Sequence, residues 1–87
     1  MAMYYVYILQ SELDKKLYIG YTNDLKKRLA EHQNGKSAAT SPRRPFKLIY
    51  YEAYVSMQDA KHRESNLKLQ ARALEGLKRR IPDCIET

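Results

Sequence analysis

The chain has 87 residues, of which 44% are hydrophobic, and its 16 lysines and arginines against 10 acidic residues give a formal net charge of +6. That length suits one small domain, predicted here to span residues 1–87, and the hydrophobic share is too high for a disordered tail. The single cysteine, Cys84, excludes an internal disulfide and a thiolate zinc site. The excess positive charge favours a polyanionic partner, with solubility alone as the alternative.

The first ten residues show no targeting signal. They have no basic region and no small-residue cleavage site, and their apolar run is too short to span a bilayer. The lack of disulfides fits a reducing compartment. We therefore expect a cytoplasmic protein with no membrane partner.

The first two predicted elements form a β-hairpin. Tyr4–Gln10 and Leu17–Tyr21 are rich in β-branched and aromatic residues, and the polar segment Ser11–Lys16 between them is typical of a turn. An antiparallel register with Tyr7 opposite Tyr18 gives one aliphatic face, made of Val6, Ile8, Leu17 and Ile19. The other face carries phenols beside a glycine, namely Tyr5, Tyr7, Tyr18 and Gly20. Registers shifted by two residues sort the faces equally well, so the faces are predicted more firmly than the pairs.

A helix is predicted after the hairpin. Thr22 or Asn23 is expected to cap a helix from Asp24 to about Gln33, and the Asn-Gly pair that follows is a typical stop signal. The next segment, Lys36–Pro45, is small, polar and basic with two prolines, so a mobile loop is predicted there.

The second half of the chain is predicted to contain one strand and two helices. Phe46–Val55 has strand composition, and Ser56 is a suitable N-cap for a helix that continues to about Leu69. A third, shorter helix is predicted over Ala73–Arg80. The order ββαβαα describes a small α+β domain, in which helices pack on a three-stranded antiparallel sheet.

The first predicted helix directs charged side chains towards the core. One side of it carries Leu25, Arg28, Leu29 and His32. A cation on this side is unusual, because cations normally take the solvent side of a helix. The alternative is that Arg28 turns outward and pairs with Asp24 or Glu31 at helical spacing.

The second predicted helix has a carboxylate within its apolar stripe. The stripe consists of Met57, Ala60, Glu64 and Leu67. An inward carboxylate needs a cation or a metal ion to offset its desolvation. The alternative partner is Lys68, which lies four residues further along the same helix.

Taken together, these side chains suit the hydrolysis of a phosphodiester. The set contains two phenols, an arginine, a histidine and a glutamate, namely Tyr7, Tyr18, Arg28, His32 and Glu64. The reaction needs a group that deprotonates water, a cation that stabilises the pentavalent phosphorane and a metal ion that neutralises the leaving oxygen.

The same residues resemble the GIY-YIG nuclease superfamily, and its small stand-alone bacterial members most closely. The resemblance rests on the tripeptides Tyr5-Val6-Tyr7 and Tyr18-Ile19-Gly20, on Leu25, Arg28 and His32 of the first helix, and on Ala60 and Glu64 of the second. It covers the chain from Tyr4 to about Arg80. It implies an enzyme, a metal-dependent endonuclease that hydrolyses DNA.

The resemblance also implies a role for each residue of this set. Tyr7 would be the general base, Tyr18 would orient water or phosphate, and Arg28 would stabilise the phosphate charge. Glu64 would be the only protein ligand of a divalent metal ion, Mg²⁺ or Mn²⁺. A phenol has a pKa of about 10 in water, so Tyr7 needs nearby positive charge to act as a base. His32 either adds to this charge or accepts the proton itself.

Two departures from the family pattern support other interpretations of the function. The first tripeptide lacks the family glycine, and Gly76 stands in the region where many family nucleases place an asparagine. The alternative function is therefore a non-catalytic nucleic-acid-binding module on the same scaffold. A small interaction domain without a nucleic-acid partner is the third reading.

Four basic residues on or beside the predicted loop are expected to contact nucleic acid, most readily DNA. They are Lys36, Arg43, Arg44 and Lys47, and their contacts should be with phosphate rather than bases. The alternative is a solvated loop whose arginines only aid solubility. A domain of this size has little surface for sequence readout, so a protein partner for targeting is a further expectation.

Overall fold

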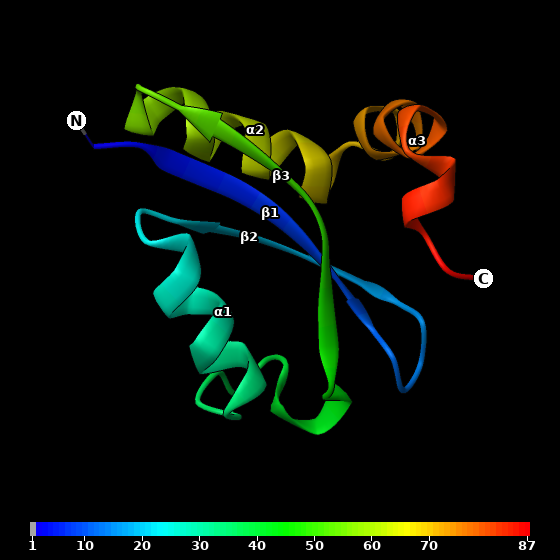
Figure 1. Ribbon diagram of the computed structural model, residues 1–87. Coiled ribbons are helices and arrows are strands. Elements are labelled where there is room, and N and C mark those ends of the chain that lie inside the picture. Colours follow the sequence, from blue (N-terminus) through cyan, green and yellow to red (C-terminus); the bar gives the residue numbers. More distant parts are fainter. Residues whose placement is uncertain (1) are drawn as a thin grey trace.

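The computed structural model describes residues 2–87, which form an antiparallel sheet and three α-helices in the predicted order ββαβαα (Figure 1). The strands are β1 (Tyr4–Ser11), β2 (Leu17–Thr22) and β3 (Phe46–Tyr54). The helices are α1 (Leu25–Gln33), α2 (Met57–Leu69) and α3 (Ala71–Arg80), with short 3-10 helices at Ser41–Arg43 and Pro82–Cys84. The sheet order is β2-β1-β3, so β1 is central and β2 is an edge strand. The predicted α+β fold class is confirmed.

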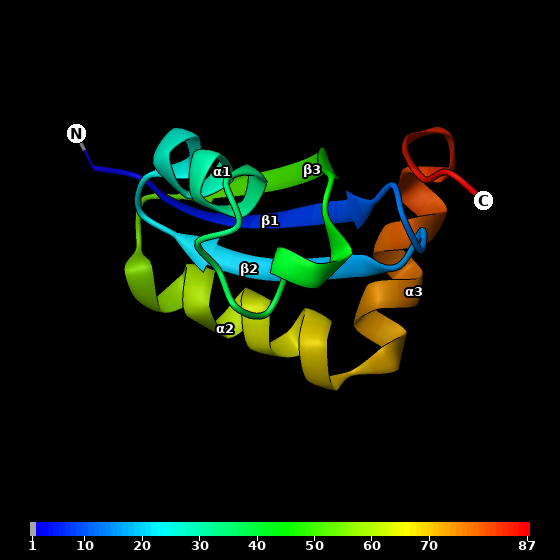
Figure 2. The same cartoon turned by 90° about the horizontal axis from the view of Figure 1, so that it is seen from below.

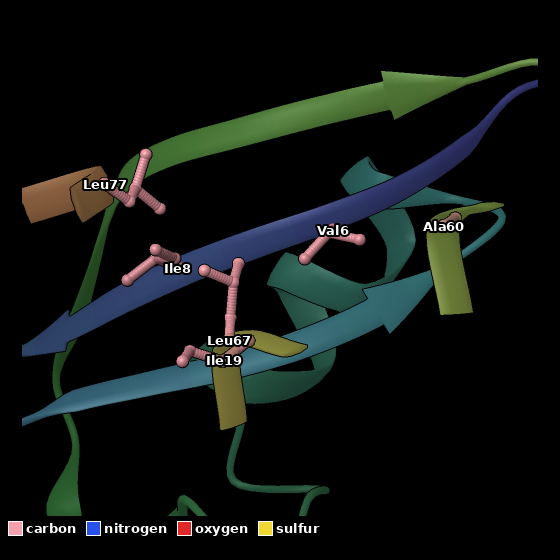
Figure 3. Packing of buried hydrophobic residues seen from close by; sticks show 6 residues of the cluster. All are labelled: Val6, Ile8, Ile19, Ala60, Leu67 and Leu77. Atoms are coloured by element: carbon pink, nitrogen blue, oxygen red, sulfur yellow. The ribbon is translucent and has the colours of Figure 1, made fainter. Parts of the chain in front are cut away.

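Helices cover both faces of the sheet. Figures 1 and 2 show α1 on one side and α2 with α3 on the other. The larger core lies between the sheet and α2–α3, and its buried members are Val6, Ile8, Ile19, Ala60, Leu67 and Leu77 (Figure 3). Fully burying one such leucine or isoleucine side chain contributes about 1.5–3 kcal/mol, so this aliphatic face holds most of the fold together.

The opposite face of the sheet carries the predicted phenols beside a glycine, but it is also a packed core. A second, smaller core forms there from Tyr7, Leu9 and Phe46. Leu25 and Leu29 of α1 pack onto it. Because α1 covers this face, Tyr7 is only 1% exposed and sits inside the protein rather than on an open phenolic surface.

The hairpin register is shifted by two residues from the pairing considered above. Tyr7 lies opposite Gly20, and Leu9 lies opposite Tyr18. The turn determines this, because the amide of Ser11 donates to the Lys16 carbonyl oxygen and so closes the turn. The turn also needs a left-handed residue, which Lys15 supplies with a φ of 65°. Nothing in the composition of the turn marks this lysine, so the exact register was not predictable.

Helix boundaries agree with the prediction within two residues, but the first cap was predicted wrongly. Asp24, and neither Thr22 nor Asn23, caps α1, with its carboxylate accepting a hydrogen bond from the amide of Lys27. Ser56 caps α2 as predicted. Gly35 ends the α1 region with a φ of 76°, as the Asn-Gly stop implied. β3 ends one residue earlier than predicted and α3 begins two residues earlier.

The segment from Lys36 to Pro45, predicted as a mobile loop, is a folded loop that is anchored to the hairpin. Ser37 and Thr40 are buried. The Ser11 hydroxyl donates to the Arg43 carbonyl oxygen, and the amide of Glu12 donates to the Pro45 carbonyl oxygen. The end of the β1–β2 hairpin thus satisfies backbone groups of the loop, a tertiary effect that local composition does not reveal.

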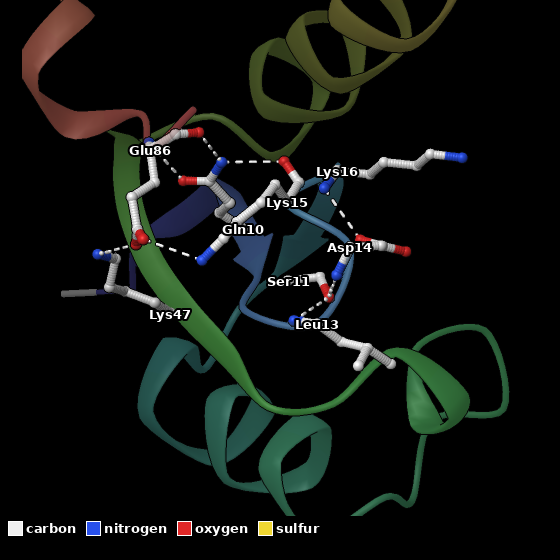
Figure 4. A network of polar contacts seen from close by, with 8 residues as sticks. All are labelled: Gln10, Ser11, Leu13, Asp14, Lys15, Lys16, Lys47 and Glu86. Atoms are coloured by element: carbon white, nitrogen blue, oxygen red, sulfur yellow. Dashed lines mark hydrogen bonds and ion pairs between the residues drawn. The ribbon is translucent and has the colours of Figure 1, made fainter.

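The end of the chain is attached to the same end of the sheet. The buried side-chain amide of Gln10 accepts a hydrogen bond from the amide of Glu86 and donates one to its carbonyl oxygen, at 2.8 and 2.7 Å. Figure 4 shows this pairing, together with the Glu86 carboxylate between Lys15 and Lys47. The Gln10 side chain thereby takes the hydrogen-bonding place that a further strand would fill, by pairing with the backbone of Glu86.

Two tyrosines of β3 contribute to a network of polar contacts between the sheet and α2. Arg63 of α2 donates through Nε to Glu52 of β3 at 3.0 Å, and the hydroxyls of Tyr50 and Tyr54 donate to the same carboxylate. Burial alone would raise the pKa of Glu52, but these hydrogen bonds hold it below its usual value. These two tyrosines therefore have a structural role separate from the candidate site.

None of the helices within residues 2–87 combines the length and the apolar character that a membrane-spanning helix needs.

Candidate active site

Tyr7 lies at the centre of the candidate site, on the central strand. Its ring extends across Gly20 of the neighbouring edge strand. A Cβ atom at position 20 would overlap the hydroxyl oxygen and Cζ of Tyr7. Glycine is therefore required at the end of the second tripeptide, because only a residue without a side chain leaves room for the phenol.

Two other rings pack against Tyr7. Tyr18, two residues before Gly20 on β2, has its ring centroid 6.4 Å from that of Tyr7. The imidazole of His32 lies 5.7 Å from the Tyr7 ring and 5.1 Å from the Tyr18 ring. Tyr7 and Tyr18 thus share one face of the sheet, as the sequence predicted, and His32 closes the cluster from α1.

His32 connects Tyr7 to the folded loop. Its Nε2 atom lies 2.8 Å from the Tyr7 hydroxyl, and its Nδ1 atom lies 2.7 Å from Oγ1 of Thr40. Burial, and then the nearby Arg28 guanidinium, lower the pKa of His32 below its usual value. The imidazole is therefore neutral at neutral pH. Thr40 was missed by the sequence analysis, because a threonine in a polar segment carries no signal of burial.

Arg28 lies one helical turn before His32 and has two neighbours of different kinds. Its Nη1 atom forms an ion pair with Glu31 at 2.9 Å, so the alternative pairing considered above is present. That hydrogen bond is also the main reason why the pKa of Arg28 is raised. The guanidinium nevertheless interacts with the Tyr7 phenol and lowers its pKa. Arg28 therefore takes part in both arrangements, and its side chain remains 32% exposed.

The pKa of Tyr7 depends on its burial and on three neighbouring side chains. Burial raises it to about 12, Arg28 opposes this rise, and the charges of Tyr18 and Glu64 add to it. In the protein alone the phenol is therefore protonated at neutral pH. Every other candidate residue acts on Tyr7, since His32 contacts its hydroxyl and the remaining three change its pKa.

Glu64 lies on α2, on the other side of the sheet, and its charge raises the pKa of the Tyr7 phenol. Ala60 and Leu67, on the same helix, are buried in the larger core, and this packing holds Glu64 partly buried at 21% exposure. Its carboxylate pairs with Lys68 at 3.0 Å, which is the alternative pairing considered above. The fourth residue of the predicted stripe, Met57, is exposed.

Glu64 is a lone carboxylate. In the part of the chain that the structure describes, no three or more histidine, cysteine, aspartate or glutamate side chains are grouped so that they could hold a metal ion. A hard ion such as Mg²⁺ often takes one or two carboxylates and completes its shell with water and substrate phosphate. The donor set therefore fits an oxygen-bound ion with one protein ligand, and it does not fit a zinc-type site.

The four predicted phosphate-binding residues are not equally available. Lys36 and Arg44 are exposed, whereas Arg43 pairs with Asp14 at 2.9 Å and its guanidinium carbon lies 5.4 Å above the Phe46 ring. Lys47 pairs with Glu86 at 3.1 Å. The loop that carries Arg43 and Arg44 also supplies Thr40, so it adjoins the site through His32.

Comparison with known families agrees with this geometry. The sequence profile of the GIY-YIG catalytic domain matches residues 3–78, which is most of the chain. The chain belongs to the GIY-YIG family. The GIY-YIG catalytic domain implies a nuclease-type enzyme with a nucleic-acid substrate, and the matched range contains all five candidate residues.

Small bacterial proteins resemble this GIY-YIG domain over most of their length. A UPF0213 protein of Syntrophus aciditrophicus is 44% identical over 75 residues, which cover 84% of this chain and 85% of the relative. One from Streptococcus pyogenes serotype M3 is 49% identical over 65 residues, or 74% and 70% of the two chains. The solution NMR structure of a UPF0213 protein from Bacillus halodurans is 38% identical with a TM-score of 0.55, covering 86% of this chain and 81% of that one.

The position of the absent family asparagine lies on α3 of this GIY-YIG domain. Gly76 occupies the middle of that helix, and, apart from its chain neighbours and the backbone of its own helix, no atom lies within 4 Å of where its Cβ would be. This glycine is therefore not required by packing, unlike Gly20.

Proposed function

We propose that this GIY-YIG domain is a metal-dependent endonuclease that hydrolyses phosphodiester bonds of DNA. The observation that carries the proposal is the convergence on the Tyr7 phenol of four groups from three elements. They are Tyr18 of β2, Arg28 and His32 of α1, and Glu64 of α2. Three separate elements supply this set around one buried phenol, and the family match gives it a known chemical context.

The roles proposed for the side chains follow from their chemistry. Arg28 stabilises the negative charge that develops on the phosphorane, and Tyr18 orients the attacking water or the phosphate. Tyr7, as phenolate, takes the proton from that water. A divalent ion, Mg²⁺ or Mn²⁺, would supply charge neutralisation at the leaving oxygen when bound. Glu64 would hold this ion, and in the metal-free protein its carboxylate pairs with Lys68.

Tyr7 needs a lower pKa before it can act as a base. In the protein alone this pKa is about 12, and the free Glu64 carboxylate is one of the groups that raise it. That contribution disappears when the carboxylate is neutralised by a bound cation. Arg28 already acts in the required direction.

The proposed function is tested by incubating the purified protein with supercoiled plasmid and with a panel of branched, flapped and single-stranded DNAs. The reactions contain Mg²⁺, Mn²⁺ or EDTA. We expect cleavage with either metal ion and none with EDTA. A Tyr7→Phe protein purified in the same way serves as the control for contaminating nuclease, and equal cleavage by both proteins would contradict the proposal.

The second candidate function is a non-catalytic nucleic-acid-binding module. Gly76 at the region of the family asparagine favours it, because one expected contact of the nuclease site is absent. This reading predicts metal-independent DNA binding by a protein that cleaves none of the panel. An RNA panel of the same structures distinguishes the two nucleic acids for both functions.

DNA binding gives a prediction about the folded loop. Neutralising both of its arginines, in an Arg43→Gln/Arg44→Gln protein, should weaken binding equally for unrelated sequences, because phosphate contacts carry no sequence information. The slope of log K against log salt should fall by about one to two units. Arg44→Gln alone should produce most of the change, since Arg43 is already paired with Asp14.

The matched control for this loop is an Arg72→Gln/Arg79→Gln protein, which removes the same charge from the exposed surface of α3. Fluorescence anisotropy at several salt concentrations measures both variants. Equal losses in the two would mean that net charge alone governs binding. An unchanged salt slope in the loop variant would mean that DNA binds elsewhere.

A further inference from the structure

Thr40 connects the folded loop to the candidate site. It is fully buried, at 0% exposure, immediately before the Ser41–Arg43 turn. Its Oγ1 atom lies 2.7 Å from Nδ1 of His32, whose Nε2 atom lies 2.8 Å from the Tyr7 hydroxyl. Three side chains thus form a continuous hydrogen-bonded chain from the loop to the phenol.

Two proton arrangements fit these distances, because a neutral imidazole has one N–H donor and one acceptor nitrogen. In the first, Nδ1–H donates to Thr40 and the Tyr7 hydroxyl donates to Nε2. In the second, the Thr40 hydroxyl donates to Nδ1 and Nε2–H donates to Tyr7. Burial and Arg28 lower the pKa of His32, so the neutral ring is the relevant form.

The two arrangements differ in whether the buried Thr40 hydroxyl proton has an acceptor. In the first, the Thr40 hydroxyl proton has no acceptor, since His32 is the only hydrogen-bond partner of this side chain within residues 2–87. An enclosed donor without a partner is costly. In the second, this proton is used, and the Tyr7 oxygen accepts from Nε2–H, which is the only arrangement with a neutral imidazole that suits a phenolate, because a phenolate has no proton to donate. The second arrangement is therefore favoured.

We propose that Thr40 is a positioning residue whose hydroxyl donates to Nδ1 of His32 and so fixes the tautomer whose Nε2–H donates to Tyr7. This inference rests on the proposed function in taking Tyr7 as the base. The Tyr7 oxygen then accepts a hydrogen bond from His32 and is influenced by the Arg28 guanidinium, and both stabilise a phenolate more than a phenol. It also excludes the role of proton acceptor for His32, because an Nε2 atom that carries a proton cannot accept the one from Tyr7, and the neutral ring acts on Tyr7 through a donated hydrogen bond rather than through a charge.

The tautomer is measured directly on protein with ¹⁵N-labelled histidine, by long-range ¹H–¹⁵N correlation of the ring signals at neutral pH. The chain has two histidines, and a His62→Gln variant assigns the signals because His62 is exposed on α2. We expect Nε2 of His32 to be protonated and Nδ1 to be unprotonated. A protonated Nδ1 would overturn the proposal. This result does not depend on whether any DNA is cleaved, so the proposal and the proposed function fail separately.

A pair of variants tests the effect on catalysis. Thr40→Val removes the hydroxyl at nearly constant volume, and Thr40→Ser keeps it. We expect kcat to fall roughly tenfold to a hundredfold in the valine variant, as for the loss of one hydrogen bond that acts on a charged group. DNA affinity should be unchanged, and the serine variant should recover most of the rate.

The serine variant separates positioning from mere packing, because it lacks the threonine methyl group but retains the donor. Cleavage by Thr40→Val at the wild-type rate would overturn the proposal, and so would a serine variant as slow as the valine one. Thermal unfolding shows whether Thr40→Val folds. If it does not, the tautomer of His32 in the wild type and the cleavage rate of the Thr40→Ser protein still test the proposal. The tautomer of His32 in Thr40→Ser should match that of the wild type.

Discussion

Replacing Gly20 with alanine is expected to abolish most DNA cleavage, although the change adds only one methyl group. The new Cβ would overlap the hydroxyl and Cζ of Tyr7. These atoms belong to a rigid ring whose hydroxyl is held by His32, so the ring must turn away and lose that contact. A base displaced by about an ångström is expected to lose on the order of a hundredfold in rate. Overpacking should also lower the free energy of unfolding by about 1–3 kcal/mol.

Gly76→Ala is the matched control for this variant. It makes the same change in a helix where, apart from the chain neighbours and the backbone of that helix, no atom lies within 4 Å of the new Cβ. Alanine is favoured over glycine in a helix interior by about 1 kcal/mol, so this variant should be slightly more stable and cleave as the wild type does. Urea unfolding and single-turnover cleavage measure both proteins. A Gly20→Ala protein that cleaves normally would remove Tyr7 from the proposed mechanism.

The faces of the strands were predictable because side chains in a strand alternate with a period of two. Val6, Ile8 and Ile19 are buried together on the predicted face. The exact register depends on the left-handed Lys15 in the turn, which no local pattern indicates. The second core under α1 was missed for a related reason. Leu9 lies on the phenolic face, and the sequence does not show that α1 covers that face.

The candidate site was predictable where a charged residue interrupts an apolar helix face. Arg28, His32 and Glu64 were singled out in this way, and their catalytic roles stay a prediction. The ion-pair alternatives for Arg28 and Glu64 are confirmed, and each side chain still influences the pKa of the Tyr7 phenol. From helical spacing alone, an ion pair on the same helix and an interaction with the site are alternative interpretations. In the folded protein, Arg28 and Glu64 each do both.

Thr40 was not predictable, because its burial comes from contacts distant in sequence. The loop is held by Ser11 and Glu12 of the hairpin and by the ion pair between Arg43 and Asp14. Each contact joins residues about thirty positions apart, beyond the reach of any local pattern. The composition of such a segment predicts a loop correctly but not whether the loop is anchored.

Replacing Glu64 with glutamine tests the proposed metal ligand and separates the enzyme from both rival functions. Glutamine keeps the size and helix propensity of glutamate but removes the charge that a hard cation requires. We expect cleavage to fall by about a hundredfold or more, as when charge stabilisation at a phosphoryl centre is lost. DNA binding measured in EDTA should hardly change. Titration with Mg²⁺ should show no saturation of residual cleavage at concentrations that saturate the wild type.

The stability of the same variant distinguishes a metal ligand from a purely structural residue. Glu64 pairs with Lys68 at 3.0 Å, and the lysine side chain is 45% exposed. A pair of this kind contributes about 0–1 kcal/mol after solvent screening, so Glu64→Gln should fold with nearly the wild-type stability. A variant that unfolds would instead assign Glu64 to the structure of α2.

Lys68→Gln is the control that breaks the same ion pair but leaves the carboxylate intact. If Glu64 acts through the pair, both variants should lose activity to a similar extent. If Glu64 binds the metal ion, Lys68→Gln should cleave at least as well as the wild type and reach half-maximal rate at a lower Mg²⁺ concentration, because the ammonium group no longer competes for the carboxylate. Wild-type cleavage by Glu64→Gln would locate the nuclease activity at another site or in another protein. In that case the binding-module function becomes the better account of the geometry around Tyr7.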